Sequence, residues 1–402
     1  MPEKIRLLKV THNFPRWKGD YAGPFVSLLA NRLLNHDIET VVVAPHHAGA
    51  EEEEDMDGVK VYRFRYASRD EDEDLAYHGE MHKLVLGSIS GIFKFRHFLE
   101  CFRKKVSDVI ERERIDAIAG HWLVPAGMVL KTVAKKYNLP TFMYSHGTDV
   151  RVVRKYSNAA YRYLRSFCLG LNRWTVVSGY LKQQMVNIDI QLEDLIDVLP
   201  LPQDETVFYA DDSVRKDDNL VVAVTRFTRQ KRVDYLLRAF AILVRQVPEA
   251  RMDIYGSGPL KPEMVQLIDQ LGLQSHVNIF DPVRQTDLRV VYNRAAIVVL
   301  NSVEEGFGLA LSEAMLCGSA VVGARSGGIT DIIEHEKRGL LVEPDDAQQL
   351  ADAMLRLLKD KPLTSQLAAA GHKFALANYA SRPLAERYAE IIRNAFPDSQ
   401  SP

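Results

Sequence analysis

The sequence lacks the features of secreted disulfide-rich, membrane-spanning or nucleic-acid-binding proteins. Its three cysteines, Cys101, Cys168 and Cys317, are too few and too scattered for a disulfide framework or a metal-ligand cluster. No run approaches the roughly 18 apolar residues that a spanning helix needs, and the apolar stretch near the N-terminus is too short for a signal peptide. The formal net charge of −2 gives no basis for nucleic-acid binding. We therefore expect a cytoplasmic protein that is soluble or lies at most on a membrane surface.

What the sequence does contain is enough apolar material for more than one core. Hydrophobic residues make up 47% and charged residues 26% of the 402 residues, which is typical of a globular protein. A chain of this length exceeds what a single hydrophobic core usually supports. Two domains are therefore the expected organisation.

Short β-branched runs alternate with longer amphipathic stretches along most of the chain. Strands that alternate with helices form βαβ units, so the pattern predicts parallel sheets covered by helices on both faces. The expected strands are residues 5–10, 39–44, 59–64, 115–119, 141–145 and 174–177, then 220–224, 252–255, 277–280, 297–300 and 320–323. The expected helices are residues 25–34, 94–112, 126–137 and 180–186, then 233–244, 263–271, 286–294, 309–317 and 347–359.

A polar stretch at residues 211–218 without hydrophobic periodicity is the best candidate for a linker. It divides the chain into a domain at residues 1–210 and another at 217–378, followed by a closing segment at 379–402. The predicted fold is two Rossmann-like, doubly wound α/β domains that face each other across a cleft. Ligands of such sheets bind at the carboxyl ends of the strands.

The strongest local motif lies at residues 304–315, where an apolar strand leads into an amphipathic helix. Gly306 and Gly308 allow the backbone to approach a ligand closely. The N–H groups of Phe307, Gly308 and Leu309 would be unpaired at the positive end of the helix dipole. This arrangement suits a phosphate.

Two carboxylates frame that motif. Glu305 precedes the first helical turn, and Glu313 lies about two turns inside the helix. They can accept hydrogen bonds from hydroxyls at opposite ends of one ligand. The alternative is an acidic helix start, with Glu313 on a solvated face.

Further strand ends converge on the same edge of the predicted sheet. Arg226 and Lys231 supply two cations after one strand, where a diphosphate would need them. Gly256 and Gly258 form a tight turn after the next strand, and residues 326–328 end another with two glycines. Each feature alone is ordinary turn chemistry, but their combination favours a binding site.

In order and spacing, these motifs resemble the family 4 retaining glycosyltransferases of the GT-B fold, with their E-x7-E motif. The resemblance implies that the second domain holds a nucleotide-sugar. Arg226 and Lys231 would bind the diphosphate, Glu305 the transferred sugar and Glu313 the ribose. The other donor-binding positions that it implies are Gly256, Gly258, Val283, Gly306, Phe307, Gly308 and Leu309.

The first domain resembles the family less tightly. Gly23 falls in the loop after the first strand, which in the family lies near the phosphates and the acceptor. His146, within residues 145–149, resembles the histidine that reaches the donor sugar, and residues 379–396 resemble the closing helix that crosses back. Departures from the family pattern at residues 199–204 and at Gly23 concern the hinge and the acceptor side. The departure at Asp281 concerns base preference.

The resemblance implies transfer of a hexosyl group with retention, from a UDP, GDP or ADP sugar, without a metal or other cofactor. Arg226, Lys231, Glu305 and His146 would be the catalytic residues, and positioning and charge stabilisation would supply the catalysis. The acceptor is unidentified: a glycan, a lipid-linked sugar and a small molecule all stay open. A non-catalytic donor-binding subunit and a sugar-nucleotide epimerase are the alternative functions. Oligomeric state is open as well.

Two other segments allow more than one interpretation. Residues 55–57 match the Asp-x-Asp spelling of metal-dependent glycosyltransferases, but within an acidic run a solvated loop is the favoured interpretation. Residues 91–105 combine aromatic and basic side chains. We favour a core helix there, because Phe95, Phe98 and Phe102 have helical spacing, while contact with an anionic membrane or lipid-linked acceptor stays open.

Overall fold

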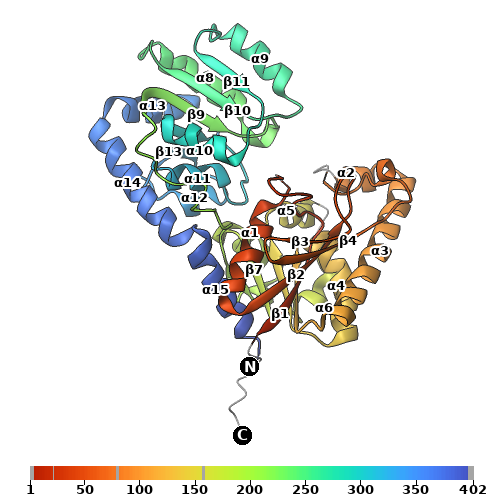
Figure 1. Ribbon diagram of the computed structural model, residues 1–402. Coiled ribbons are helices and arrows are strands. Elements are labelled where there is room, and N and C mark those ends of the chain that lie inside the picture. The colour runs from red at the N-terminus through yellow and green to blue at the C-terminus, as the bar shows by residue number, and fades with distance from the viewer. Residues whose placement is uncertain (1–3, 21, 78–80, 156–158, 397–402) are drawn as a thin grey trace. The chain divides into compact units, whose positions relative to one another are not determined.

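The computed structural model describes residues 4–20, 22–77, 81–155 and 159–396 (Figure 1). The chain forms two compact units. Unit 1 comprises Met1–Val177, Leu181–Pro202 and Ser381–Pro402, and unit 2 comprises Ser178–Tyr180 and Gln203–Ala380. Each unit is an α/β domain built on a mainly parallel sheet, so the predicted two-domain α/β fold class is confirmed.

Unit 1 contains an eight-stranded sheet in the order β3-β4-β2-β1-β5-β6-β7-β8. All neighbouring strands are parallel except β3 and β4. The central strands are buried and rich in Val, Ile and Ala, as expected for strands covered on both faces. The strands are β1 (Ile5–Val10), β2 (Ile38–Pro45), β3 (Glu53–Met56), β4 (Val59–Phe64), β5 (Ala117–His121), β6 (Thr141–Ser145), β7 (Arg173–Val176) and β8 (Ile196–Val198).

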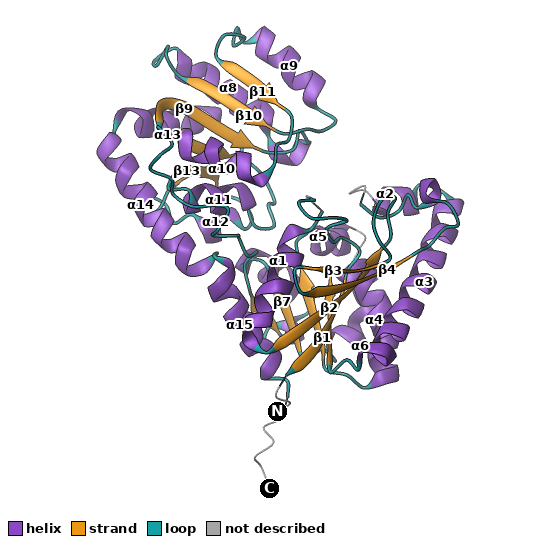
Figure 2. Cartoon of the chain, viewed as in Figure 1, coloured by secondary structure: helices purple, strands orange, loops and turns teal. Residues whose placement is uncertain are grey.

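Helices cover both faces of this sheet (Figure 2). The last helix of the chain returns to unit 1, where Arg32 donates a hydrogen bond to Ser381 Oγ at 2.9 Å and Tyr388 is fully buried. The helices are α1 (Pro24–Leu33), α2 (Met81–Leu86), α3 (Ile89–Glu113), α4 (Met128–Tyr137), α5 (Thr148–Lys155), α6 (Ala159–Cys168), α7 (Gly179–Val186, whose first two residues group with unit 2) and α15 (Ser381–Arg393).

Unit 2 contains a six-stranded parallel sheet in the order β11-β10-β9-β12-β13-β14. The strand order reverses between β9 and β12, which makes their carboxyl ends the topological switch point of the sheet. Its strands are β9 (Asp217–Val224), β10 (Arg251–Tyr255), β11 (Val277–Phe280), β12 (Ala295–Leu300), β13 (Ala320–Ala324) and β14 (Leu340–Val342). Its helices are α8 (Val233–Val244), α9 (Lys261–Gln270), α10 (Gln285–Arg294), α11 (Leu309–Leu316), α12 (Ile329–Ile332), α13 (Ala347–Lys359) and α14 (Lys361–Asn378).

The expected acidic loop at residues 55–57 is wrong in part, because the acidic run forms an edge strand. β3 pairs antiparallel with β4 through a tight turn at Asp57 and Gly58, both with positive φ. Asp55 accepts the backbone N–H of Gly58 at 2.7 Å, and Asp57 pairs with Lys18. The carboxylates therefore cap a turn, and a charged edge strand of this kind resists pairing with other chains.

The expected linker at residues 211–218 is also wrong. Asp217 and Asp218 already belong to β9, and Asp211 accepts a hydrogen bond from Arg289 within unit 2. The chain instead passes from unit 1 to unit 2 between Pro202 and Gln203. The polar composition of residues 211–216 reflects an exposed loop that leads into the sheet.

Candidate functional site

The loops that follow β9 and β12 meet at the switch point of the unit 2 sheet. Lys231 ends a 3-10 turn after β9, and its Nζ donates to the carboxylate of Glu305, which follows β12. Burial raises the pKa of Glu305, but the charge and hydrogen bond of Lys231, with Ser302 and Arg226, outweigh burial and leave that pKa below its ordinary value. Glu305 is therefore held as a carboxylate, with Arg226 close enough to act on its charge.

Arg226 itself extends into solvent. It immediately follows the loop start after β9 and is exposed, and no carboxylate of the described chain lies within ion-pair distance of its guanidinium. An exposed cation beside the half-buried pair of Lys231 and Glu305 leaves excess positive charge at the site. The geometry suits a ligand with two negative groups.

The backbone before α11 offers further donors. Gly308 caps the helix at φ +118°, a conformation that favours glycine. Phe307 is buried edge-on against Tyr379, with ring centroids 5.3 Å apart, which fixes the turn. Across the described ranges, the N–H groups of Phe307, Gly308 and Leu309 have no backbone acceptor. These N–H groups are therefore available at the start of the helix, an arrangement that suits an anion.

A pair of glycines supports this turn from behind. A Cβ at Gly327 would lie 2.3 Å from the carbonyl oxygen of Glu305, and one at Gly328 would lie 2.4 Å from that of Gly306. Gly328 N–H also donates to the Glu305 carbonyl at 2.7 Å. Only glycine permits this approach, so the glycines after β13 position the loop that carries Glu305.

The turn that contains Gly256 and Gly258 supports the loop after β9 in the same way. A Cβ at Gly256 would lie 1.8 Å from the Thr225 carbonyl oxygen, and one at Gly258 would lie 2.6 Å from that of Phe227. Phe227 N–H donates to the Ser257 carbonyl at 2.9 Å. The loop after β10 therefore lies directly on the segment that carries Arg226.

Glu313 is buried, so the alternative of a solvated face is wrong. It lies inside α11, and its Oε2 accepts a hydrogen bond from the Tyr292 hydroxyl at 2.8 Å. Burial raises the pKa of Glu313 to about 7, while the hydrogen bond from Tyr292 acts in the opposite direction. The carboxyl group is therefore close to half-protonated at neutral pH.

Val283 lies apart from these residues. It is exposed in the loop after β11, whereas the other candidates of unit 2 follow β9, β10 and β12. Nearby, the exposed Phe280 stacks on Tyr255, with ring centroids 4.8 Å apart. Asp281, the departure noted in the sequence, forms an exposed ion pair with Lys261 at 2.7 Å.

In unit 1, His146 belongs to a buried cluster at the carboxyl ends of β5 and β6. Its Nε2 lies 3.0 Å from Nδ1 of His121, and the ring of Trp122 lies 4.4 Å away. Asp149 orders the segment by accepting the backbone N–H groups of Leu123 and Gly147 at 2.9 and 3.1 Å. His146 Nδ1 has no partner within the described residues and can bond to a ligand.

Burial keeps the histidines of this cluster uncharged. Burial, then the charges of Lys9 and His12, lower the pKa of His146 well below its ordinary value. Burial also lowers the pKa of His12 to about 4 and that of Lys9 to about 7. His146 is therefore a neutral hydrogen-bonding group at physiological pH.

Sequence reasoning missed Lys9, His121 and Trp122 as members of this cluster. Lys9 was visible as a charged residue inside an otherwise apolar strand, and His121 ends a buried strand next to the one that leads to His146. Gly23 also lies in unit 1, at φ +57° before α1, where a Cβ would lie 2.6 Å from the Asn13 carbonyl oxygen. The close approach of Gly23 to this carbonyl oxygen shapes the loop after β1.

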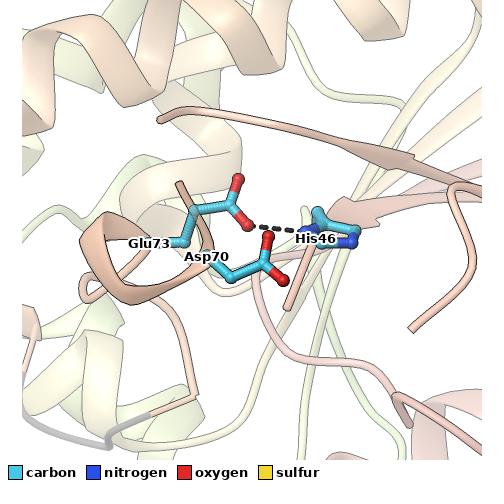
Figure 3. A group of neighbouring side chains, drawn as sticks. All are labelled: His46, Asp70 and Glu73. Atoms are coloured by element: carbon cyan, nitrogen blue, oxygen red, sulfur yellow. Dashed lines mark hydrogen bonds and ion pairs between the residues drawn. The ribbon is translucent and has the colours of Figure 1, made fainter. Parts of the chain in front are cut away.

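His46, Asp70 and Glu73 are the one group in the described chain whose ligand atoms gather as in a metal site (Figure 3). These atoms are already engaged. His46 Nδ1 lies 2.5 Å from Glu73 Oε2, its Nε2 lies 3.1 Å from the Ala50 carbonyl oxygen, and Arg65 bonds to Asp70. We interpret the group as an ion-pair network that fixes the turn after β4.

Comparison with known proteins matches each unit to a family model of glycosyltransferases. The model described as Glycosyltransferase Family 4 matches residues 22–205, and that described as Glycosyl transferases group 1 matches residues 208–374. N-acetyl-alpha-D-glucosaminyl L-malate synthase of Bacillus anthracis is 25% identical over 80% of this chain and 85% of its own. A D-inositol 3-phosphate glycosyltransferase of Nocardioides is 33% identical over 42% of this chain and 40% of its own.

Solved structures agree on the fold. Sucrose-phosphate synthase of Thermosynechococcus elongatus superposes with a TM-score of 0.79 at 20% identity, covering 97% of this chain and 99% of its own. Anabaena HepE, solved with UDP and glucose, gives a TM-score of 0.72 at 18% identity, covering 97% and 100%. No helix in the described residues is long and apolar enough to cross a membrane.

Proposed function

Because the chain belongs to glycosyltransferase family 4 and has the GT-B fold, we propose that it is a retaining hexosyltransferase that uses a nucleotide-diphosphate sugar and needs no metal ion. The observation that carries this proposal is the group formed by Arg226, Lys231 and Glu305 at the start of α11. Its cations would neutralise the diphosphate in place of a metal ion.

The diphosphate would bind between the cations and the helix start. Its oxygens would accept hydrogen bonds from Arg226 and from the N–H groups of Gly308 and Leu309, and Lys231 would be shared between a phosphate and Glu305. As the bond to the sugar breaks, negative charge grows on the leaving phosphate. Donors that are already fixed in place stabilise that charge without reorganising.

The two carboxylates would orient the rest of the donor. Glu305 would accept hydrogen bonds from hydroxyls of the transferred sugar, and Glu313 from the ribose hydroxyls. The exposed aromatic surface at Phe280, together with Val283, would lie at the nucleobase. UDP, GDP and ADP are the candidate nucleotides, and the printed title of the HepE structure, which names UDP and glucose, favours UDP as the first to test.

His146 would contribute a neutral hydrogen bond to the sugar from unit 1. Retention follows if the acceptor attacks from the face that the leaving phosphate departs from, and the phosphate then takes the acceptor proton. This route needs no enzymic nucleophile, in keeping with a site made of cations, backbone donors and orienting carboxylates. The three free cysteines fit a reducing, cytoplasmic location.

The test is acceptor-dependent release of the nucleoside diphosphate from UDP, GDP and ADP sugars. L-malate and inositol phosphate, taken from the names of the relatives, head the acceptor panel, and proton NMR of the product reports the anomeric configuration. Arg226→Ala should lower kcat/KM by about 10²–10³-fold. Arg229→Ala is the matched control, because Arg229 is an exposed arginine three residues away.

Three results would contradict the proposal. They are an inverted product, equal activity in Arg226→Ala and the wild type, and sugar isomers formed without an acceptor. Nucleotide binding without release under any acceptor would favour a donor-binding subunit. Lys231→Ala is a poorer probe, because it also leaves the half-buried Glu305 without its partner.

A further inference from the structure

Lys9 is a buried charged group of unit 1 to which the proposed transfer reaction assigns no role. It lies in the central strand β1, its side chain is fully buried, and its Nζ has no hydrogen-bond partner in the described part of the chain. The ammonium group lies 5.5 Å from the centre of the Tyr388 ring, so α15 covers it. Burial without a counter-charge costs stability, and it lowers the pKa of Lys9 to about 7. Packing alone therefore does not account for a lysine at this position.

Lys9 faces the same side of the sheet as two histidines at the ligand edge. Lys9 pairs with Ala119 of β5. His121, at the end of β5, pairs with Tyr144 of β6. Paired residues of a parallel sheet share a face, and so do side chains two positions apart along a strand. His121 and His146 lie two positions beyond Ala119 and Tyr144, so both histidines project from the face that carries Lys9.

One hydrogen bond links the tautomers of these histidines. His121 Nδ1 and His146 Nε2 lie 3.0 Å apart, and burial keeps both rings neutral by lowering their pKa values. A neutral imidazole carries one proton, on one of its two nitrogens. If His121 donates from Nδ1, its Nε2 is a bare acceptor and His146 carries its own proton on Nδ1. If His146 donates from Nε2 instead, His121 carries its proton on Nε2 and His146 Nδ1 is the bare acceptor.

The surroundings of His121 favour the first arrangement. Its Nε2 is buried and has no hydrogen-bond partner among the described residues. Among the neighbouring charges, that of Lys9 acts most strongly on His121. An ammonium group donates hydrogen bonds and accepts none, and its charge attracts a nitrogen lone pair and repels an N–H dipole. A water between the two groups would carry the same preference, because it would accept from the lysine and donate to the histidine.

Two other groups on this face do not supply such a donor. The Tyr144 hydroxyl already donates to the Leu199 carbonyl oxygen at 2.7 Å. His12 is neutral, because burial lowers its pKa to about 4. The Tyr388 hydroxyl is buried without a partner in the described chain, so the experiment has to separate its effect from that of Lys9.

We propose that Lys9 is a positioning residue that sets the tautomers of His121 and His146, so that His146 presents an N–H at Nδ1 to its ligand. The inference rests on the proposed function only for the identity of that ligand, the transferred sugar. An N–H at this position donates to a sugar oxygen and cannot take up a proton. His146 therefore orients the sugar and is not the base that removes the acceptor proton, in keeping with the leaving phosphate in that role.

The experiment reads the tautomers directly, by nitrogen NMR of the full-length protein labelled at its histidine rings. Protonated and bare ring nitrogens give separate signals, and spectra of His121→Gln and His146→Gln assign the two rings. In the wild type we expect both rings to be protonated at Nδ1 at about pH 6, where Lys9 is charged because its pKa is about 7. Lys9→Met should lose this preference and place the proton of His146 on Nε2 in a large part of the molecules.

Two control variants should keep the wild-type tautomers. Tyr388→Phe removes the second buried hydrogen-bond donor and retains the ring beside Lys9. Lys4→Met removes an exposed lysine that lies just before the same strand.

Stability and turnover should change in different directions in Lys9→Met. Methionine has nearly the length of lysine and carries no charge, so the melting temperature should equal or exceed that of the wild type. The value of kcat should fall on the order of tenfold, less than on removal of His146, because the ring stays in place. The nucleotide dissociation constant should not change, and Lys4→Met should match the wild type in every measurement.

Several outcomes would overturn the proposal. They are wild-type protein in which His146 Nδ1 is bare, unchanged tautomers in Lys9→Met, and altered tautomers in Tyr388→Phe. Changed tautomers with an unchanged kcat would remove the role of the His146 N–H, and a much lower melting temperature of Lys9→Met would assign Lys9 to stability. The NMR and melting measurements need no turnover. If no acceptor supports transfer while the tautomers behave as expected, the proposed function fails and the assignment of Lys9 stands.

Discussion

Substituting Glu313 by glutamine should affect stability and ligand binding in opposite directions. Burial raises the pKa of Glu313 from 4.5 to about 7 in the folded chain. The folded state therefore holds its proton more tightly than the unfolded state, and stability falls as pH rises between those two values. At 1.36 kcal/mol per pH unit, the wild type loses roughly 3 kcal/mol across this range.

Glu313→Gln removes the ionisation and keeps the hydrogen bond from Tyr292. At pH 5 the variant and wild type should melt at similar temperatures, whereas at pH 8 the variant should melt at least about 6 °C higher, at 2–4 °C per kcal/mol for a domain of this size. Nucleotide binding should change in the other direction. The wild-type affinity should rise about tenfold from pH 6 to pH 8 as the carboxylate forms, and the variant should bind weakly at both.

The assay is a thermal melt at pH 5 and pH 8, paired with titration calorimetry of the nucleotide at pH 6 and pH 8. Glu249→Gln, an exposed glutamate of unit 2, is the control and should match the wild type throughout. A Glu313→Gln protein that is less stable at pH 8 would refute the burial argument. Unchanged nucleotide affinity in that variant would remove Glu313 from the ribose site.

Three further outcomes follow from the geometry. Gly327→Ala should weaken nucleotide binding at least about tenfold, because the new Cβ would lie 2.3 Å from the Glu305 carbonyl oxygen. Gly272→Ala is the control, because Gly272 has a similar positive φ but lies in open space, and this variant should bind nucleotide normally. Equal affinities of the two variants would contradict the supporting role of Gly327. His146→Ala should lower turnover about 10²-fold and leave the nucleotide dissociation constant unchanged. Because the pKa of His146 is far below its ordinary value, the wild-type rate should show no titration of this residue between about pH 6 and 8. EDTA should leave turnover intact; a loss that Mg²⁺ restores would direct attention to the cluster around His46.

The sequence predicted that the charges of the proposed donor site lie close together, because each of them follows a strand. Arg226, Lys231 and Glu305 lie just after two apolar runs, and parallel topology brings such ends together. Local spacing alone therefore indicated that these charges would meet. The roles of Gly327 and Gly328 were less visible, because the carbonyl oxygens of Glu305 and Gly306 that they approach belong to a loop more than twenty residues earlier.

The local sequence pattern could not predict which charged groups are buried. Glu313 lies on a helix that is buried nearly all round, so helical periodicity gave no sign of which face is solvated. The ammonium group of Lys9 lies over the ring of Tyr388, a residue of the last helix. No property of the β1 sequence indicates that contact. β3 was missed because three of its four residues are acidic, which opposes the usual preferences of a strand.

The most direct test of the account is calorimetric titration of UDP, GDP and ADP into the wild-type protein and into Arg226→Ala. The account predicts that one nucleotide binds the wild type without added metal and that Arg226→Ala weakens this binding by at least about tenfold, or 1.4 kcal/mol. No binding of any nucleotide, or equal binding by both proteins, would contradict the claim that the switch point of unit 2 holds a nucleoside diphosphate.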